Sequence, residues 1–266
     1  MSKLLTSLSI IAASLFLGYL LQQLTARGRL RLPIALADLR KALQRIALLG
    51  ILPLTMTAAI WVVEVHTIRI AALPLIGAGA MILGGLLALA GARLLRLSPR
   101  LTGALVPCGS FTNLGSIGSL VCYFYLGEAG FALVPIYKLL EELTYYTMGF
   151  PIAKYYSTVD GDVDSTAERL RALGRDPFIR VTLTSILIGI VLNLSGLPRP
   201  AFFAALNAVF IPLGTGLLLV SIGLALRFSR MKRYKGPCAA VIGIKFLAVP
   251  VAAVGVAYCL GYGSID

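Results

Sequence analysis

The stretch Pro107–Ser119, with the sequence PCGSFTNLGSIGS, interrupts one of the most apolar parts of the chain. Pro107 lacks a backbone N–H, and the glycines that follow it weaken a helix. Backbone amides and carbonyls are therefore expected to be free of helical hydrogen bonds here. Hydrocarbon cannot satisfy such groups, so a break of this kind persists only where it lines a cavity or is buried in protein.

Two interpretations of this stretch remain open. In the first, it is a substrate site in a broken transmembrane helix, and half-helix ends present partial charges to a ligand, with an exposed N-terminus favouring an anion. In the second, it is a kinked helix whose glycines only permit close packing. We expect the break at Pro107 and Gly109, and the candidate substrate-binding residues are Ser110, Thr112, Asn113, Gly115, Ser116 and Gly118.

The composition of the whole chain predicts an all-α polytopic membrane protein. Of 266 residues, 58% are hydrophobic and 13% are charged, and the mean hydropathy is +0.90. The apolar residues fall in long runs of roughly membrane-spanning length. The net charge of +13 is spread over short loops between these runs. This is the positive-inside pattern of membrane proteins and argues against nucleic-acid binding.

About eight transmembrane helices are predicted from these runs. The connections after the first, third, fifth and seventh spans carry most of the lysines and arginines, so we expect them on the cytoplasmic side, with the N-terminus outside. The expected location is a bacterial inner (cell) membrane. The spans lie near residues 5–24, 44–63, 71–95, 101–125, 130–153, 178–197, 203–226 and 237–261.

A weak internal repeat divides the chain. SLFLGYLL at 14–21 resembles SILIGIVL at 185–192, and LPLTMTA at 52–58 resembles IPLGTGL at 211–217. An odd number of spans separates the two copies, which is the arrangement of an inverted repeat. We expect a first repeat of five spans over residues 1–156, a cytoplasmic linker with a short helix over 157–176, and a second repeat with only three spans over 177–266. Either the second repeat is incomplete, with three of the five spans, or the chain is a fragment of a ten-span carrier.

Two segments of the chain resemble the sequences of a known family. GSFTNLGSIGSLVCYFYLGEAGFALVPIY, residues 109–137, is similar to the crossover segment of the auxin efflux carrier family of membrane transporters, and the run from Arg175 to Leu226 resembles the second half of that family. The resemblance implies inverted five-helix repeats with a broken fourth helix at a crossover. It also implies transport of small organic anions such as carboxylates or auxin-like compounds. The alternative function is a non-transporting membrane scaffold or sensor derived from a transporter.

Charged residues inside the spans are further candidates, because each is costly in lipid without a partner or water. Lys138 lies three and four residues before Glu141 and Glu142 on the expected helix. These three residues form either a relay for protons or for a coupling cation, or a structural ion pair. Lys245 is either a countercharge for an anion or a side chain that snorkels to the cytoplasmic edge, and snorkelling is favoured.

The remaining features predict packing rather than chemistry. No motif of a membrane enzyme is visible, and neither a cofactor nor a metal site is expected. Small residues recur every four positions in the third span, which favours a close helix contact inside the protein over a homodimer seam. The expected partners are the lipid bilayer, a small organic anion, and protons or a cation. The small residues are Ala80, Gly84, Ala88 and Ala92.

Overall fold

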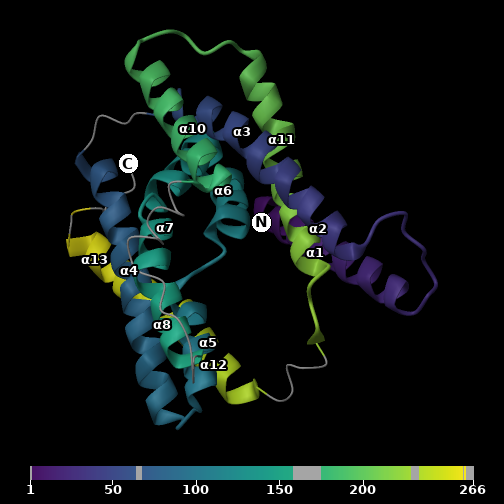
Figure 1. Cartoon of the computed structure of the whole chain (residues 1–266). Coiled ribbons are helices and arrows are strands. Elements are labelled where there is room, and N and C mark those ends of the chain that lie inside the picture. Colours follow the sequence, from purple (N-terminus) through teal and green to yellow (C-terminus); the bar gives the residue numbers. More distant parts are fainter. Residues whose placement is uncertain (1, 64–67, 158–174, 229–233, 260, 262–266) are drawn as a thin grey trace. The chain divides into compact units, whose positions relative to one another are not determined.

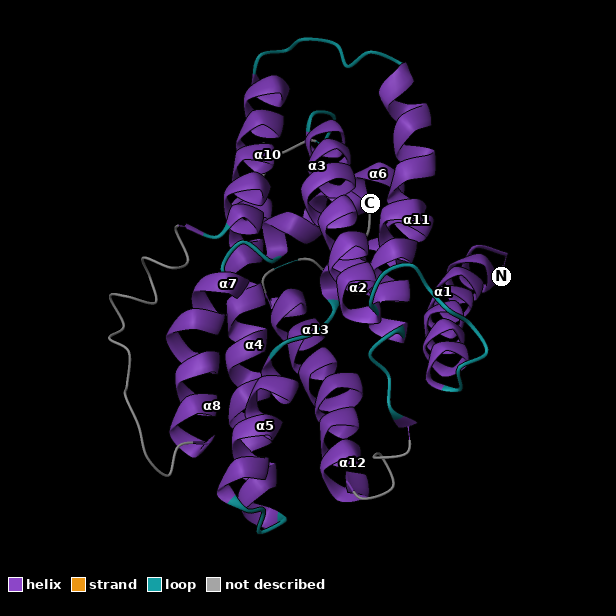
Figure 2. Ribbon diagram, turned by 45° about the vertical axis from the view of Figure 1, so that its right-hand side comes forward, coloured by secondary structure: helices purple, strands orange, loops and turns teal. Residues whose placement is uncertain are grey.

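The computed structural model describes residues 2–63, 68–157, 175–228, 234–259 and 261. The linker helix expected within residues 157–176 falls almost entirely outside these ranges. The described residues form helices without strands (Figure 2), and the protein is an all-α polytopic membrane protein. Its α-helices are α1 Ser2–Ala26, α2 Leu36–Arg45, α3 Leu52–Ile60, α4 Ile68–Leu94, α5 Pro99–Ser110, α6 Ser119–Tyr137, α7 Glu141–Thr144, α8 Phe150–Ser157, α10 Pro177–Leu194, α11 Phe202–Gly223, α12 Lys235–Gly243 and α13 Val249–Cys259.

Seven helical runs among the described residues are long and apolar enough to cross a membrane. One of them, Pro99–Ala153, has 55 residues, roughly twice what a single crossing needs. It is divided at Gly127, whose φ of 67° and ψ of −156° belong to a region that only glycine adopts without strain. The sequence prediction of about eight spans counts the two sides of Gly127 separately.

Among the described residues, four π-helical segments interrupt the spans, and three of them have a common cause. They are η1 Ile46–Ile51, η2 Leu114–Gly118, η3 Tyr145–Gly149 and η5 Ile244–Ala248. Pro53, Pro151 and Pro250 each lie two residues beyond the end of η1, η3 and η5. A proline ring clashes with the carbonyl four residues earlier, and a wider turn moves that carbonyl aside. Each of these prolines is therefore accommodated by a π-bulge, and the helix continues beyond it.

The described chain forms two compact units, and two of the five points at which the chain passes from one unit to the other, 112/113 and 136/137, lie at or next to helix interruptions. The first unit contains residues 1–70, 113–136 and 176–227, and the second contains residues 71–112, 137–175 and 228–266. Each unit takes segments from both sides of the linker. The units are therefore a different division of the chain from the two repeats expected from the sequence, and the repeats stay a prediction.

In the first unit, two helix pairs pack in a reciprocal manner. Helix α1 lies against α11 and α10 lies against α3 (Figure 1). Gly18 of α1 permits the first contact, because a Cβ there would meet the backbone of Val220 and Gly223. Gly189 of α10 permits the second, because its Cβ would meet Ile60. The two glycines lie in the two segments that the sequence comparison aligned, Ser14–Leu21 and Ser185–Leu192.

The apolar core of the first unit lies between these pairs. It includes Ile60 of α3, Phe131 of α6 and Ile211 of α11, all essentially inaccessible to solvent. Asn193 of α10 supports this core, because its Nδ2 donates to the carbonyl oxygens of Ile60, Trp61 and Val63 at distances of 3.1, 2.9 and 2.7 Å. These carbonyls lie at the C-terminal end of α3, where a helix leaves its last carbonyl groups without intrahelical partners.

In the second unit, α4 packs along α5 through its small residues. Gly84 of α4 lies against the backbone of Gly109, and Ala88 and Ala92 are fully buried beside Leu105 of α5. The internal contact that the four-residue spacing predicted is therefore confirmed for this part of the helix. Helix α8 packs against the other part of α5, where Gly103 meets Tyr156.

Candidate functional site

The first helix interruption lies at Phe111–Asn113. Helix α5 ends at Ser110, Phe111 is extended with φ −95° and ψ 138°, and Asn113 is also outside the helical region at φ −75° and ψ 60°. The expected break at Pro107 and Gly109 is therefore wrong by a few residues. Pro107 is accommodated inside α5, where its carbonyl still accepts from the N–H of Phe111 at 2.9 Å.

Gly109 has a packing role instead. It is buried against α4, where a Cβ would collide with the side chain of Ala88 and the carbonyl of Gly84. Helix α5 ends at Ser110, where a side-chain donor is available for the carbonyl groups that lack a helical partner. This explains why the break follows the proline and does not coincide with it.

Lys245 supplies that donor. Its Nζ donates to the carbonyl oxygen of Phe111 and, at 2.8 Å, to the hydroxyl oxygen of Thr112. Both contacts are within the second unit. The π-helical turn before Pro250 carries Lys245, and a cation is favourable at the negative C-terminal end of α5. The ammonium group of Lys245 therefore lies beside the interruption, and the two interpretations of this residue stay predictions.

The other side of the interruption has the opposite polarity. Asn113 precedes η2, which continues into α6, and its exposed side chain makes no capping hydrogen bond. The first N–H groups of a helix have no partner within it, and they carry its partial positive charge. The ammonium group of Lys245 thus lies at the negative C-terminal end of α5. The side chain of Asn113 does not cap the positive N-terminal end of η2. The local electrostatics favour an anion.

The remaining predicted residues of the stretch divide between the two units. Ser110 is the last residue of α5, and its hydroxyl oxygen lies beside Gly85 of α4. Gly115, Ser116 and Gly118 belong to η2, in which Ser116 is buried. Ser119, just beyond them, donates from its hydroxyl to the carbonyl oxygen of Leu114 at 3.3 Å. The hydroxyl of Ser119 thus helps to hold the backbone of η2.

A second interruption lies at Lys138–Leu140, between α6 and α7. These residues form a turn in which the N–H of Glu141 donates to the carbonyl oxygen of Lys138 at 2.8 Å. The Nζ of Lys138 and the Oε2 of Glu141 form an ion pair at 2.8 Å across this turn. The charged group predicted on a continuous helix therefore lies at a break, and Lys138 and Glu141 are brought together. Glu142 is the next residue of α7.

The flanks of the two interruptions touch within the second unit. The ring of Phe111 packs edge-to-face against the ring of Tyr145, with centroids 5.2 Å apart, and it fills the space beside Gly149. Gly77 of α4 lies against the carbonyl of Tyr137, where the second interruption begins. Direct packing thus connects Phe111, at the first interruption, with the segment that follows the second.

A buried polar cluster in the first unit was missed by the sequence analysis. Arg199 forms an ion pair with Glu128, and their side chains are only 12% and 19% exposed. Arg199 also donates to the carbonyl oxygen of Ala58 at 3.0 Å, and the Nδ2 of Asn207 donates to Glu128 at 2.9 Å. The signal in the sequence is that Glu128 follows the turn at Gly127 inside an apolar run, where a charge requires a partner.

Asn207 completes this cluster with an unsatisfied atom. Its side chain is fully buried, and no donor lies within hydrogen-bonding distance of its Oδ1. The cluster joins the turn before Glu128, the connection between α10 and α11, and the end of α3. The ion pair and the hydrogen bonds hold these three segments of the first unit together.

Comparison with known proteins gives one informative similarity. The chain is 25% identical over 187 residues to an "Uncharacterized transporter" of Methanothermobacter thermautotrophicus, a match that covers 69% of this chain and 57% of that protein. The match thus spans little more than half of the relative's length. No family model matches the chain, and no solved structure matches it.

Proposed function

We propose that the protein is a secondary membrane transporter for small organic anions, such as carboxylates or auxin-like compounds, and not an enzyme. The observation that carries this proposal is the interrupted helix at Phe111–Asn113, where Lys245 neutralises one helix end and the other keeps its positive character. Non-helical backbone at membrane depth is characteristic of transporter binding sites. The similarity to a protein described as a transporter supports the same class.

Anion binding follows from the donors present at the interruption. An ammonium group has three N–H donors, and Phe111 and Thr112 accept two from Lys245. The third is available to a carboxylate. The amide of Asn113 and the first N–H groups of η2 are donors on the first-unit side of the interruption, and we propose that they too can bind a carboxylate.

We further propose an auxin-carrier-like architecture with two inverted repeats, in the cell membrane with the N-terminus outside. The reciprocal packing of α1 on α11 and of α10 on α3, through the equivalent glycines Gly18 and Gly189, supports a two-fold relation between the copies. Alternating access in such transporters is a movement of one bundle relative to another around the bound substrate.

Protons or a cation are the proposed coupling ions, and the turn at Lys138–Leu140 is their proposed site. Lys138 pairs with Glu141, and we propose that either Glu141 or Glu142 is the carboxylate that binds the proton. Replacement of each by Gln should preserve insertion and, in at least one case, flatten the pH dependence of transport. Replacement of Glu141 by Gln should also lower stability, because it removes the ion pair with Lys138.

Transport by purified protein in liposomes tests the function directly. Uptake of radiolabelled indole-3-acetate and of labelled malate should exceed that of empty vesicles, and Lys245→Met should reduce it at least tenfold. Lys235→Met removes the same charge from an exposed position of the same span and should leave uptake unchanged. Absence of uptake for all tested carboxylates by well-folded protein would favour the alternative of a non-transporting scaffold or sensor.

A further inference from the structure

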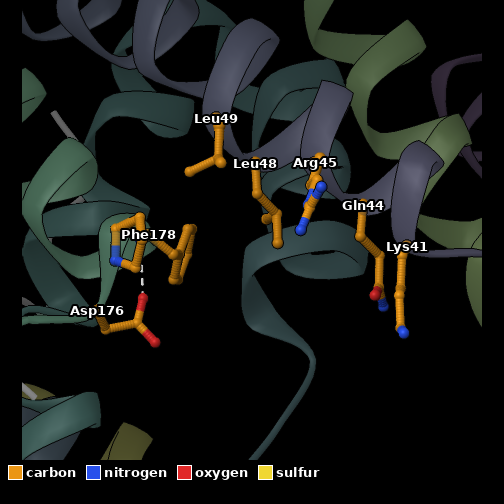
Figure 3. Close-up of a pocket in the computed structure, with 8 residues that line it drawn as sticks. Lys41, Gln44, Arg45, Leu48, Leu49, Asp176 and Phe178 are labelled. Atoms are coloured by element: carbon orange, nitrogen blue, oxygen red, sulfur yellow. Dashed lines mark hydrogen bonds between the residues drawn. The ribbon is translucent and has the colours of Figure 1, made fainter. Parts of the chain in front are cut away.

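A pocket of about 230 Å³ lies in the first unit. One wall is formed by α2 and η1, and the other by the beginning of α10 (Figure 3). The lining residues are Lys41, Gln44, Arg45, Leu48, Leu49, Asp176, Pro177 and Phe178.

The polar end of this pocket is basic. Lys41, Gln44 and Arg45 extend from the same side of α2 (Figure 3), and Lys41 and Arg45 are exposed. Gln44 and Arg45 lie three and four residues after Lys41, which places the three side chains on one face of α2. Leu48 lies on the same face, within η1. Two cations and an amide donor one turn apart suit a phosphate group.

Asp176 is the one acidic residue of the lining, and it is already engaged. Its Oδ1 accepts from the N–H groups of Phe178 and Ile179 at 2.8 and 3.3 Å. It thereby caps the N-terminus of α10, where the helix dipole compensates a negative charge. The carboxylate fixes the wall that carries Phe178 and forms no ion pair with Lys41 or Arg45.

The other end of the pocket is apolar. Leu48 and Leu49 lie on one side and Phe178 lies across the gap from them (Figure 3). Leu49 is 40% exposed. The polar helix α2, which has no buried residue, passes here into the apolar run that ends at Ile60. The pocket thus changes from basic to apolar along the direction in which the chain enters the membrane.

We propose that this pocket binds an anionic phospholipid, with the headgroup phosphate held by Lys41 and Arg45 and an acyl chain against Leu48, Leu49 and Phe178. A free inorganic anion would use the basic end alone and would leave the adjoining apolar wall exposed. Clusters of basic residues beside membrane helices attract anionic lipids. The site is independent of the proposed transport substrate.

Native mass spectrometry of the purified full-length chain tests this site. Dioleoyl phosphatidylglycerol is titrated against dioleoyl phosphatidylcholine, which has the same acyl chains and no net charge. We expect preferential retention of phosphatidylglycerol, and a loss of that preference of about tenfold or more in Lys41→Ala/Arg45→Ala. Arg31→Ala/Arg40→Ala is the matched control, since it removes the same charge from exposed residues outside the lining.

Three results would overturn the proposal. Equal retention of the two lipids would exclude headgroup recognition, and an equal loss in the control pair would show a general effect of charge. Displacement of phosphatidylglycerol by millimolar inorganic phosphate, without an effect of Leu49→Asn, would identify a simple anion site. Lys41→Gln/Arg45→Gln, compared by thermal unfolding with the parent chain, separates loss of binding from loss of folding.

Discussion

Individual polar side chains in this protein satisfy backbone groups that lipid cannot. Asn193 is the strongest example, because one amide group donates to three carbonyls at the end of α3. We predict that Asn193→Ala lowers the free energy of unfolding by about 1–3 kcal/mol, the cost of unsatisfied buried groups. Thermal unfolding in detergent measures the change. Ser195→Ala is the control, since that exposed hydroxyl bonds within its own turn, and an equal effect of both variants would contradict this role.

The pair Glu128–Arg199 makes a second prediction at this scale. Loss of one partner leaves the other charge buried, which costs about 3–5 kcal/mol. Glu128→Gln and Arg199→Gln should therefore each destabilise the protein strongly, whereas the double variant should be more stable than the sum of the two losses predicts. A double-mutant cycle on unfolding temperature measures this coupling. Additive losses would show that the two side chains do not depend on each other.

At the scale of the elements, close glycine contacts position the helices. We predict that Gly18→Ala and Gly189→Ala each destabilise the protein by about 1–3 kcal/mol, because the added methyl group meets backbone or Ile60. Gly79→Ala on α4 is the control, since nothing lies within 4 Å of its Cβ position. It should be neutral or slightly stabilising, given the helix propensity of alanine. Similar effects of all three substitutions would show that the two helix contacts are not tight.

The helix interruptions show what could be predicted from sequence at this scale. Glycines, proline and Asn113 in an apolar run indicated the first break to within a few residues, because these residue types weaken helices locally. The second break was missed, since the spacing of Lys138 and Glu141 also fits a continuous helix. The partners of Lys245 and Glu128 could not be predicted either. They lie 134 and 71 residues away in the chain, and hydropathy carries no information on which distant groups meet.

For the whole molecule, hydropathy and charge predict both the membrane class and the orientation. The orientation is tested in a cysteine-free background. A single cysteine at Thr166 in the linker should be shielded from a membrane-impermeant thiol reagent in intact cells, because that connection carries the basic residues of the inner side. Ser195→Cys, at the turn between α10 and α11, should react readily. The reverse pattern of labelling would invert the orientation of every loop.

We propose that the interruption at Phe111–Asn113 binds an organic anion, and substrate counterflow in liposomes with Asn113→Ala tests this claim. Cys122→Ala is the control, because this residue lies farther along the same segment and is interpreted as packing. We predict that Asn113→Ala reduces apparent affinity by roughly 5- to 150-fold, equivalent to about 1–3 kcal/mol, and that Cys122→Ala changes it little. Near-normal counterflow by Asn113→Ala at equal protein content would contradict the claim and reduce the break to a packing feature.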